Sequence, residues 1–533
     1  MKPALPPLTP ALAPEVLERL PAVTADSRTV TPGGVFVALP GAHHNGSAFI
    51  PQALAAGARL VVADPASVEA FKATHPDAPL HSCPDPARWL ALMAEELARR
   101  HQGPAPDCVV AVTGTNGKTS TADFLRQLWK REGLTAASIG TLGLVSDVAL
   151  PAPPALTTPD AVSMASALHD LAQAGVNHVV VEASSHGLAQ RRLDGVPLKG
   201  AGFTNLTRDH LDYHGTMADY GTAKMRLFDT LLPPGAVAAA VTALEGAWLE
   251  RLRATAQSRG LHWRLVGERS KGGERPWLEV LEAMPEPGGQ RVQLAWQGKA
   301  LPPFLFPVPG RFQLDNALLA LALCAPAGTG EGTVKRLVGH LEHLKGVPGR
   351  CECCAMLPQG AGASPAALYV DYAHTPDALE KVLDSLRPHV APGGRLWVVL
   401  GAGGDRDRGK RPLMGAAAVR GADGVIITDD NPRHEDPAAI RQAVLEGALA
   451  ERAAQHQSKL IHEVAGRAQA LQQAVAGLGP GDVLLVAGKG HEKGQIIGDE
   501  VHPFDDRALT AALAHAQALQ SNAPPANPTG EQP

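Results

Sequence analysis

Residues 108–120 read Cys-Val-Val-Ala-Val-Thr-Gly-Thr-Asn-Gly-Lys-Thr-Ser, an apolar run that stops at a glycine-lysine turn. The run has the length and β-branching of a buried parallel strand, and residues 119–131 have the pattern of a helix. Gly114 and Gly117 let the backbone curl around an anion, and the positive end of the helix faces it. The stretch therefore predicts an α/β fold with a phosphate-binding loop, although Val112 stands where the standard pattern has glycine.

The residues after the second glycine carry the chemistry of a nucleotide site. Lys118 supplies a point charge, and Thr119 supplies a hydroxyl that can hold Mg2+. The alternative is a chance Gly-Lys-Thr sequence on a surface loop, and the flanking strand and helix argue against it. We therefore expect the chain to bind a nucleoside triphosphate.

Length and composition limit the other classes. With 533 residues, the chain has room for about three domains. Its 48 basic and 53 acidic residues nearly cancel and its aromatic content is only 4%, so no nucleic-acid partner is expected. No signal peptide is evident, and no apolar run reaches the roughly 18 residues of a membrane span. We therefore expect a cytoplasmic protein without membrane insertion.

The six cysteines do not form the disulfide framework of a secreted protein. Cys351 and Cys354 have the C-x-x-C spacing of a metal or redox site, but no second ligand pair follows them. We expect this segment to be a strand that carries small apolar side chains.

Alternating strand, turn and helix patterns predict an α/β protein of three domains. Short strand-like runs fill residues 1–103. Residues 104–345 alternate strand and helix around the phosphate loop, with an antiparallel excursion between 230 and 300. Residues 346–520 repeat the alternation as a doubly wound, Rossmann-like domain. Residues 521–533 are rich in Pro, Asn and Gln and are expected to form a disordered tail.

Polar residues at strand ends are the candidate ligands, because sites in open α/β sheets form beyond the carboxyl ends of the strands. Glu182 ends one strand and suits Mg2+ beside a phosphate loop. Ser184, two residues later, has the alternative role of a helix cap. His210 lies in a cluster of acids and imidazoles that, taken alone, is typical of a surface loop. Lys224 lies on a predicted helix, where an exposed lysine with an apolar stem is the ordinary interpretation.

Three loops of the last domain follow predicted strands. Residues 401–411 offer glycine amides and more cations than acids, which favours a carboxylate or phosphate ligand. Residues 428–433 and 488–492 lie at strand ends of the same sheet. Together the three loops suit a ligand with both ammonium and carboxylate groups, and three ordinary turns are the alternative.

A set of motifs taken together resembles the Mur ligase family, and the resemblance runs from about residue 26 to residue 507. The phosphate loop of that family has the shorter Gly-Thr-Asn-Gly-Lys-Thr form, which accounts for Val112. The motifs are residues 114–119, 182–188 and 204–215, Lys224, residues 310–312 with Asn316, and residues 371–377, 430–433 and 488–492.

The resemblance implies a three-domain protein that binds the UDP end of its substrate in the first domain, ATP in the central P-loop domain and an amino acid in the third. The ATP positions of the family are occupied by Gly114, Thr115, Asn116, Gly117, Lys118, Thr119, Ser120, Asn316 and Arg350. Its UDP-muramoyl-peptide positions are occupied by Ser27, Thr157, Thr158, Ser184, Gln190 and Arg192. Its diaminopimelate positions are occupied by Arg406, Asp430, Asn431, Pro432, Arg433, Gly488 and Glu492.

The resemblance also implies catalytic and metal-binding roles. The metal positions are occupied by Thr119, Glu182 and His210, and the catalytic positions by Lys118, Glu182, Lys224 and His374. Lys224 matches a lysine that the family carbamylates with CO2, which converts an ammonium into a carboxylate able to serve a metal site. His374 is a candidate for orienting the amino acid or assisting proton removal.

The implied reaction is ATP-dependent amide formation in peptidoglycan precursor synthesis, by a monomer with Mg2+ as cofactor and ATP as co-substrate. The D-glutamate γ-carboxylate of UDP-N-acetylmuramoyl-L-alanyl-D-glutamate attacks the γ-phosphate, and the amine of meso-2,6-diaminopimelate then displaces phosphate from the acyl phosphate. No protein nucleophile is needed, so catalysis rests on positioning and electrostatics. The Asp-Asn-Pro-Arg tetrapeptide at residues 430–433 is the diaminopimelate signature of the family, with Arg433 gripping the distal carboxylate.

Four alternatives are weighed against this interpretation. A lysine-adding member of the family would have no distal carboxylate to hold. The Asp-Asn-Pro-Arg tetrapeptide argues against that member and against a folylpolyglutamate synthetase-like ligase. A nucleotide-dependent switch or transport ATPase would hydrolyse ATP independently of an amino acid. A non-catalytic nucleotide-binding scaffold is disfavoured because Lys118, Glu182 and Lys224 are all present.

Overall fold

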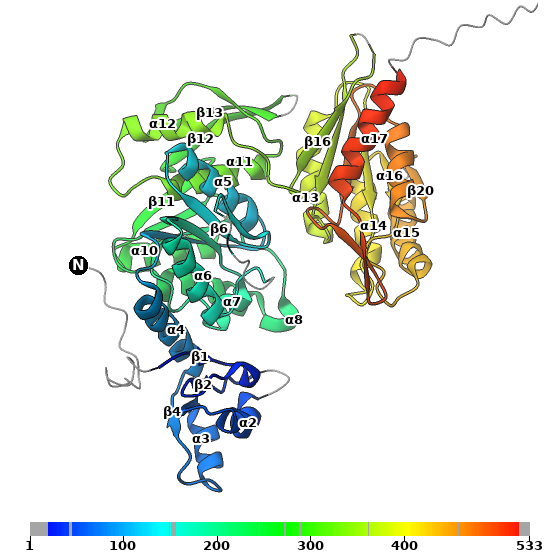
Figure 1. Ribbon diagram of the computed structural model, residues 1–533. Coiled ribbons are helices and arrows are strands. Elements are labelled where there is room, and N and C mark those ends of the chain that lie inside the picture. Colours follow the sequence, from blue (N-terminus) through cyan, green and yellow to red (C-terminus); the bar gives the residue numbers. More distant parts are fainter. Residues whose placement is uncertain are drawn as a thin grey trace, which may run out of the picture. The chain divides into compact units, whose positions relative to one another are not determined.

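The computed structural model describes residues 20–521, apart from 42–44, 149, 151–155, 245, 271–272, 287–288, 361 and 456–457 (Figure 1). The tail predicted at 521–533 lies outside the described residues, except that Ser521 ends the last helix. The chain divides into two compact units. The first runs through residue 280 and takes in 294–301 and 315–341, and the second takes in 281–293, 302–314 and the residues from 342 onward.

A small parallel sheet begins the first unit. Its strand order is β1-β2-β3-β4, with all neighbours parallel. The strands are β1 (Val23–Thr24), β2 (Val35–Val37), β3 (Leu60–Ala63) and β4 (Leu80–Ser82). The helices are η1 (Ser27–Thr29), η2 (Gly46–Phe49), α2 (Ile50–Ala55), α3 (Pro65–Lys72) and α4 (Pro86–Gln102).

Helix α4 connects this small sheet to the rest of the unit. Asp85 caps the helix by accepting a bond from the amide of Arg88, and Pro86 occupies its first turn. The buried side chains of Trp89 and Met93 join the apolar core of the small sheet, which also contains Ala165. Ala165 belongs to α6 (Ala161–Gln173), so one core is shared by the small sheet, α4 and α6.

A second sheet contains β5 (Cys108–Thr113) between parallel neighbours β8 (His178–Glu182) and β9 (Leu198–Phe203). The strand order is β14-β13-β12-β11-β10-β9-β5-β8-β6-β7, and β15 pairs with β13. The antiparallel excursion predicted within residues 230–300 is confirmed, because β14 pairs antiparallel with β13. The other strands are β6 (Ala136–Gly140), β7 (Gly143–Ser146), β10 (Val237–Val241), β11 (His262–Gly267), β12 (Leu278–Glu286), β13 (Gly289–Trp296), β14 (Lys299–Ala300) and β15 (Phe304–Phe306).

Helices cover this sheet and bury its β-branched strands. Val109, Val179 and Val181 are fully buried against side chains such as Leu168 of α6, as the apolar sequence of a parallel strand predicts. The remaining helices are α5 (Lys118–Arg131), α7 (Ser185–Ala189), α8 (Leu211–His214), α9 (Met217–Arg226), η3 (Leu227–Leu231), α10 (Ala247–Ser258), α11 (Arg311–Cys324) and α12 (Glu331–Leu341).

The second unit is doubly wound, as the sequence predicts. Its strand order is β16-β17-β21-β18-β19-β20, and only β16 runs antiparallel to its neighbour. The strands are β16 (Glu352–Leu357), β17 (Ala366–Asp371), β18 (Leu396–Leu400), β19 (Gly424–Ile427), β20 (Leu460–Glu463) and β21 (Val483–Ala487), and a hairpin of β22 (Gly494–Ile497) and β23 (Glu500–Pro503) follows. Cys353 and Cys354 lie on β16, which confirms the predicted strand.

Helices lie on both faces of this sheet (Figure 1). Leu383 and Met414 pack against one face, and Leu471 packs against the other. The helices are α13 (Pro376–Leu386), η4 (Arg387–His389), α14 (Lys410–Gly421), α15 (Pro437–Ala454), α16 (Arg467–Ala476) and α17 (Asp506–Ser521). Within the described ranges, none of the helices is both long enough and apolar enough to cross a membrane.

A fully buried ion pair ties the last helix to the strand ends. Arg467 donates to both carboxylate oxygens of Asp506, at 2.8 and 2.7 Å, and both side chains are 0% exposed. The same guanidinium donates to the carbonyl of Ala487, the last residue of β21, and to the carbonyl of Asp429, just after the end of β19. A charge buried this deeply is tolerated only when it is paired and hydrogen-bonded in this way.

Candidate active site

The predicted phosphate loop follows the carboxyl end of β5 and leads into α5. Gly114 and Gly117 have φ values of +142° and +86°, which glycine adopts without strain. A Cβ at Gly114 would lie 1.9 Å from Thr204 Oγ1, and one at Gly117 would lie 2.4 Å from Asn316 Oδ1. Glycine is therefore required at both positions by backbone conformation and by space.

Two residues that follow strand β9, Thr204 and Asn205, hydrogen-bond to the phosphate loop. Asn205 accepts from the amide of Asn116 at 3.0 Å and donates to its carbonyl at 3.1 Å. Thr204 Oγ1 donates to the same carbonyl at 2.5 Å. Strand β9 ends at Phe203, and the side chains of Thr204 and Asn205, which follow it, bind the loop.

Lys118 and Thr119 begin α5 beside this loop. Lys118 Nζ donates to the carbonyls of Gly114 and Thr115, at 3.0 and 2.8 Å, so its charge lies over the loop. Thr119 Oγ1 donates to Glu182 Oε2 at 3.1 Å, at the end of β8. The adjacent ends of β5 and β8 thus bring together a cation, a hydroxyl and a carboxylate.

Glu182 is the centre of a buried polar network. Its two oxygens accept from the amide and the hydroxyl of Thr141, at 2.9 and 3.1 Å. Gly140 makes room for it, because a Cβ there would lie 2.1 Å from Oε1. Thr141 has no motif signal in the sequence, and its role follows only from the pairing of β6 with β8.

Five of the six residues predicted to hold the muramoyl peptide belong to one hydrogen-bonded chain that starts at Glu182. Thr158 Oγ1 donates to the Glu182 carbonyl at 2.7 Å, and the Thr141 and Thr157 hydroxyls lie 3.2 Å apart. The chain continues through Ser184, Arg192 and Gln190 to the hydroxyl of Tyr213. The exposed ring of Tyr213 was not predicted as a site residue. Ser27 lies apart from this chain on η1, where its hydroxyl donates to Gln52 at 2.9 Å.

The chain turns sharply where α7 ends. The amides of Arg192 and Arg191 donate to the carbonyls of Gly187 and Leu188, and Arg191 has a φ of +62°. This is the Schellman arrangement, in which glycine is the usual residue at the left-handed position. An arginine there costs about 1 kcal/mol or more in backbone strain.

Lys224 of α9 approaches the phosphate loop from the other side. Its Nζ donates to the Gly114 carbonyl at 2.8 Å and lies 4.5 Å from the centre of the Tyr220 ring. The side chain is 1% exposed, so the interpretation as a solvated surface lysine is wrong. Burial, followed by repulsion from Lys118, holds the pKa of Lys224 well below its ordinary value.

His210 lies in an aromatic cluster near this loop. Its ring is 4.9 Å from that of His186 and 6.2 Å from that of Tyr220, and its side chain is about half exposed. Among the described residues, no three His, Cys, Asp or Glu side chains are arranged to hold a metal ion. The metal-binding role of His210 therefore stays a prediction.

In the second unit, the three predicted loops gather at the carboxyl ends of β18, β19 and β21. Asn431 donates to Glu492 Oε2 at 3.1 Å and accepts from Lys489 Nζ at 2.9 Å. Lys489 is fully buried and also lies 3.2 Å from Glu492. Gly488 gives Asp430 room, because a Cβ there would lie 2.6 Å from its Oδ2. Lys489 was not predicted, because a lysine between two glycines gave no signal of burial.

Arg433 and Arg406 belong to the same group of loops. Arg433 Nη1 donates to the Gly404 carbonyl at 2.8 Å, and a Cβ at Gly403 would lie 3.0 Å from Arg433 Nη1 and 3.6 Å from the Arg406 stem. The backbone of Arg433 has a φ of +51° and pairs with the hairpin at Ile496. The hairpin therefore fixes the direction in which this guanidinium leaves the backbone. Pro432, between Asn431 and Arg433, is buried.

Arg350 and His374 flank Tyr372, after β17. The Arg350 guanidinium lies 4.7 Å from the centre of the Tyr372 ring, and the exposed His374 ring lies 4.6 Å from it. Asp371 is buried and accepts from the amides of Cys351 and Ala373, and burial raises its pKa. His374 follows the carboxyl end of β17, which is parallel to β21, so it lies at the same edge of the sheet as the three loops.

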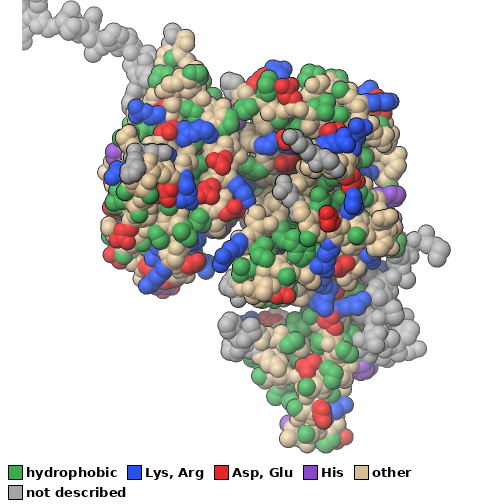
Figure 2. Space-filling view, turned by 180° about the vertical axis from the view of Figure 1, so that it is seen from behind, with side chains coloured by type: hydrophobic (Ala, Val, Ile, Leu, Met, Phe, Trp, Pro, Cys, Tyr) green, Lys and Arg blue, Asp and Glu red, His purple; other side chains and the backbone are tan. Residues whose placement is uncertain are grey.

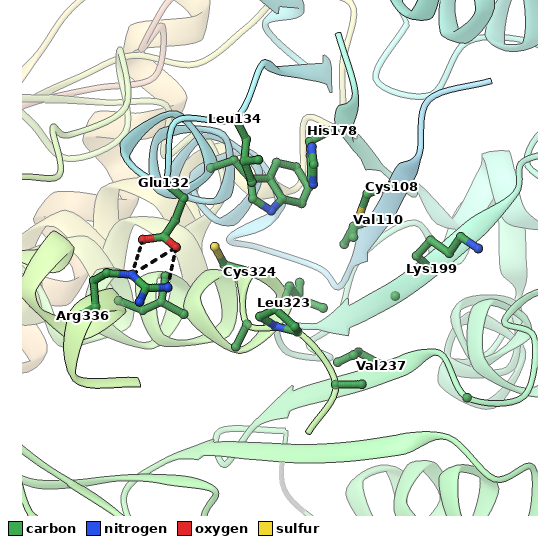
Figure 3. Close-up of a pocket in the computed structure, with 17 residues that line it drawn as sticks. Cys108, Val110, Glu132, Leu134, His178, Lys199, Val237, Leu323, Cys324 and Arg336 are labelled. Carbon is green, nitrogen blue, oxygen red and sulfur yellow. Dashed lines mark hydrogen bonds and ion pairs between the residues drawn. The ribbon is translucent and has the colours of Figure 1, made fainter. Parts of the chain in front are cut away.

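A cavity of about 350 Å³ lies at the opposite edge of the large sheet (Figure 3). Its lining includes Cys108, Lys199 and Val237, near the amino ends of β5, β9 and β10. Glu132 at its wall is paired with Arg336. A strand of six residues is about 20 Å long, so this cavity is remote from the phosphate loop.

Figure 2 shows that basic and acidic side chains are interspersed over the visible face of the protein. This agrees with the near balance of 48 basic and 53 acidic residues. The fold and the site together define a phosphate-loop α/β protein with a second cluster of charged side chains at the strand ends of its second unit.

Comparison with known proteins identifies the family. Residues 20–96 match the model of the Mur ligase family catalytic domain, 112–324 the Mur ligase middle domain, and 349–490 the Mur ligase glutamate ligase domain. The chain belongs to the Mur ligase family.

Individual relatives agree with this assignment. The chain is 47% identical, over 92% of its length and 94% of the relative, to a protein from Caulobacter vibrioides named UDP-N-acetylmuramoyl-L-alanyl-D-glutamate--2,6-diaminopimelate ligase. A solved structure of a ligase of that name has 32% identity and a TM-score of 0.66, covering 93% of this chain and 95% of the other. The ADP complex of Mycobacterium tuberculosis folylpolyglutamate synthase shares the fold, with 19% identity and a TM-score of 0.56, covering 81% and 94%.

Proposed function

We propose that this Mur ligase adds meso-2,6-diaminopimelate to UDP-N-acetylmuramoyl-L-alanyl-D-glutamate at the expense of ATP, as a cytoplasmic monomer in peptidoglycan precursor synthesis. The observation that carries the substrate assignment is the Arg433 guanidinium, held by the hairpin and by Gly404 beside the Asn431–Glu492 network. Full-length relatives named for the same reaction support it.

The first unit supplies what the first half of the reaction needs. Amides of the phosphate loop and Lys118 suit the phosphates, and the hydroxyl and carboxylate of Thr119 and Glu182 fit the oxygen preference of Mg2+. Bound there, Mg2+ would neutralise charge that develops on the transferred phosphoryl group. The Thr158–Gln190 chain begins at Glu182, so a peptide carboxylate on that chain is presented to the phosphate loop.

The second half needs a neutral amine and a fixed amino acid. The Arg433 fork suits the distal carboxylate of diaminopimelate, and Glu492 and Asp430 suit its ammonium groups. Lys489 neutralises part of the acidic charge and keeps Glu492 in place. His374, exposed at the end of β17, is a candidate for orienting the attacking amine.

The assay that tests this function measures phosphate release from ATP with UDP-muramoyl dipeptide and a panel of amino acids. We expect release to require both the dipeptide and diaminopimelate, with lysine a much poorer substrate. Release that does not depend on an amino acid would instead support a switch ATPase. Equal rates with lysine would contradict the assigned specificity.

Lys224 is proposed to be carbamylated. The reaction with CO2 requires the neutral amine, and burial, which lowers the pKa of Lys224, favours that form. We expect mass spectrometry of native protein to show one added CO2 on Lys224, and activity to fall when bicarbonate and CO2 are removed. Lys130, exposed on α5, is the control and should stay unmodified. Full activity of protein with an unmodified Lys224 would contradict the proposal.

A further inference from the structure

The turn that carries Gln190 and Arg192 rests directly on α4. Gly195 lies so close to this helix that a Cβ there would be 2.3 Å from the Ala91 carbonyl oxygen and 3.1 Å from Glu95 Cβ. Four residues earlier, Arg191 Nε lies 3.1 Å from Asp85 Oδ2, at the beginning of the same helix. Helix α4 therefore packs directly against residues 191–195.

The other side of this segment is held by α9. Arg226, two residues after Lys224, donates to both oxygens of Asp194 at 3.2 and 3.0 Å, and also to the Leu188 carbonyl. The turn is thus fixed between the helix that carries Lys224 and the helix that packs on the small sheet.

The residue type at position 191 is unusual for its backbone. The left-handed position after α7 favours glycine, which would remove the strain at no steric cost. The arginine present there reaches Asp85 with its side chain, and this arginine side chain is one-third exposed. Asp85 uses Oδ1 to cap α4 through the Arg88 amide, which leaves Oδ2 for Arg191.

We propose that the Asp85–Arg191 ion pair sets the spacing between the small sheet and the turn that holds the peptide end of the substrate. The inference rests on the proposed function, in which one UDP-peptide spans Ser27 and the Gln190–Arg192 turn. When two contacts to one ligand are held at the right spacing, the second forms with little further loss of entropy. Arg191 is thus a positioning residue that acts through Gln190 and Arg192.

Two substitutions test the pair from its two ends. Arg191→Gly removes the guanidinium and relieves the backbone, and Asp85→Asn keeps the helix cap but removes the charge. Each should raise KM for UDP-muramoyl dipeptide about two- to fivefold, as expected for a partly exposed pair, while kcat and KM for ATP stay unchanged. The double variant should be no worse than either single one. Arg99→Ala, which breaks an exposed pair within α4, is the control and should change nothing.

Hydrogen exchange provides a readout that needs no turnover. In Asp85→Asn, the amides of Arg192, Asp194 and Val196, which are all hydrogen-bonded within the turn, should exchange faster than in the wild type. If exchange speeds up but KM for the dipeptide does not change, the positioning role is wrong. If neither changes, the ion pair itself is without effect and the inference fails. If the wild type makes no product but exchange responds, the proposed function fails and the structural coupling stands.

Discussion

Lys118→Ala should lower kcat by at least about 100- to 1,000-fold. The Lys118 ammonium lies over the phosphate loop, 3.0 and 2.8 Å from two of its carbonyl oxygens. Lys118 is the first residue of α5. Without it, the charge that builds up during phosphoryl transfer loses a positive counter-charge at the phosphate loop. Steady-state ADP release with saturating dipeptide and diaminopimelate measures the effect.

The control for this substitution lies on the same helix. Lys130→Ala removes an exposed lysine that pairs with exposed Asp147, and it should leave kcat unchanged. Lys118→Met, which keeps most of the stem, should lose as much activity as the alanine variant while keeping the melting temperature of the wild type. Activity within tenfold of the wild type in a folded Lys118 variant would show that phosphoryl transfer does not depend on this charge.

Arg433→Ala should lower kcat/KM for diaminopimelate by about 100-fold and leave KM for ATP unchanged. Two charge-assisted hydrogen bonds to a carboxylate are together worth about 3 kcal/mol, which corresponds to that factor. Arg433→Lys should recover only part of the loss, because an ammonium cannot make the bidentate contact. Initial rates over a range of diaminopimelate concentrations measure both effects.

Arg408→Ala is the matched control on the neighbouring loop. Arg408 is 76% exposed and pairs with Glu435, so its loss should leave diaminopimelate use unchanged. The assignment of Arg433 would be wrong if its variant lost ATP and diaminopimelate affinity equally. It would also be wrong if lysine became no better, relative to diaminopimelate, after the substitution.

The local parts of the fold were predictable from sequence because they depend on neighbours along the chain. The glycines of the phosphate loop, the apolar strand before it and the helix after it all appear where the pattern places them. Polar residues at strand ends also indicated the loops of the second unit. The exact start of a helix is harder to predict: α16 begins only at Arg467, because the Val464 amide donates to the Ile427 carbonyl and extends the sheet.

The contacts that were missed join residues far apart in the sequence. Thr141 reaches Glu182 only because β6 lies beside β8, and strand order has no signature in a single sequence. Lys224 looked like a surface lysine because helical periodicity does not reveal that its end meets the Gly114 carbonyl. Family resemblance corrected that interpretation, whereas neither pattern nor resemblance indicated that Lys489 is buried or that Asp85 pairs with Arg191.

The buried Arg467–Asp506 pair has a consequence for how the chain matures on the ribosome. Until Asp506 has been synthesised, the Arg467 guanidinium lacks the carboxylate to which it is hydrogen-bonded, and burying it at the ends of β19 and β21 would be unfavourable. We therefore expect the sheet of the second unit to reach its final packing only after α17 has been synthesised and has docked. The first unit contains neither residue of this pair, so we expect that its folding does not depend on α17.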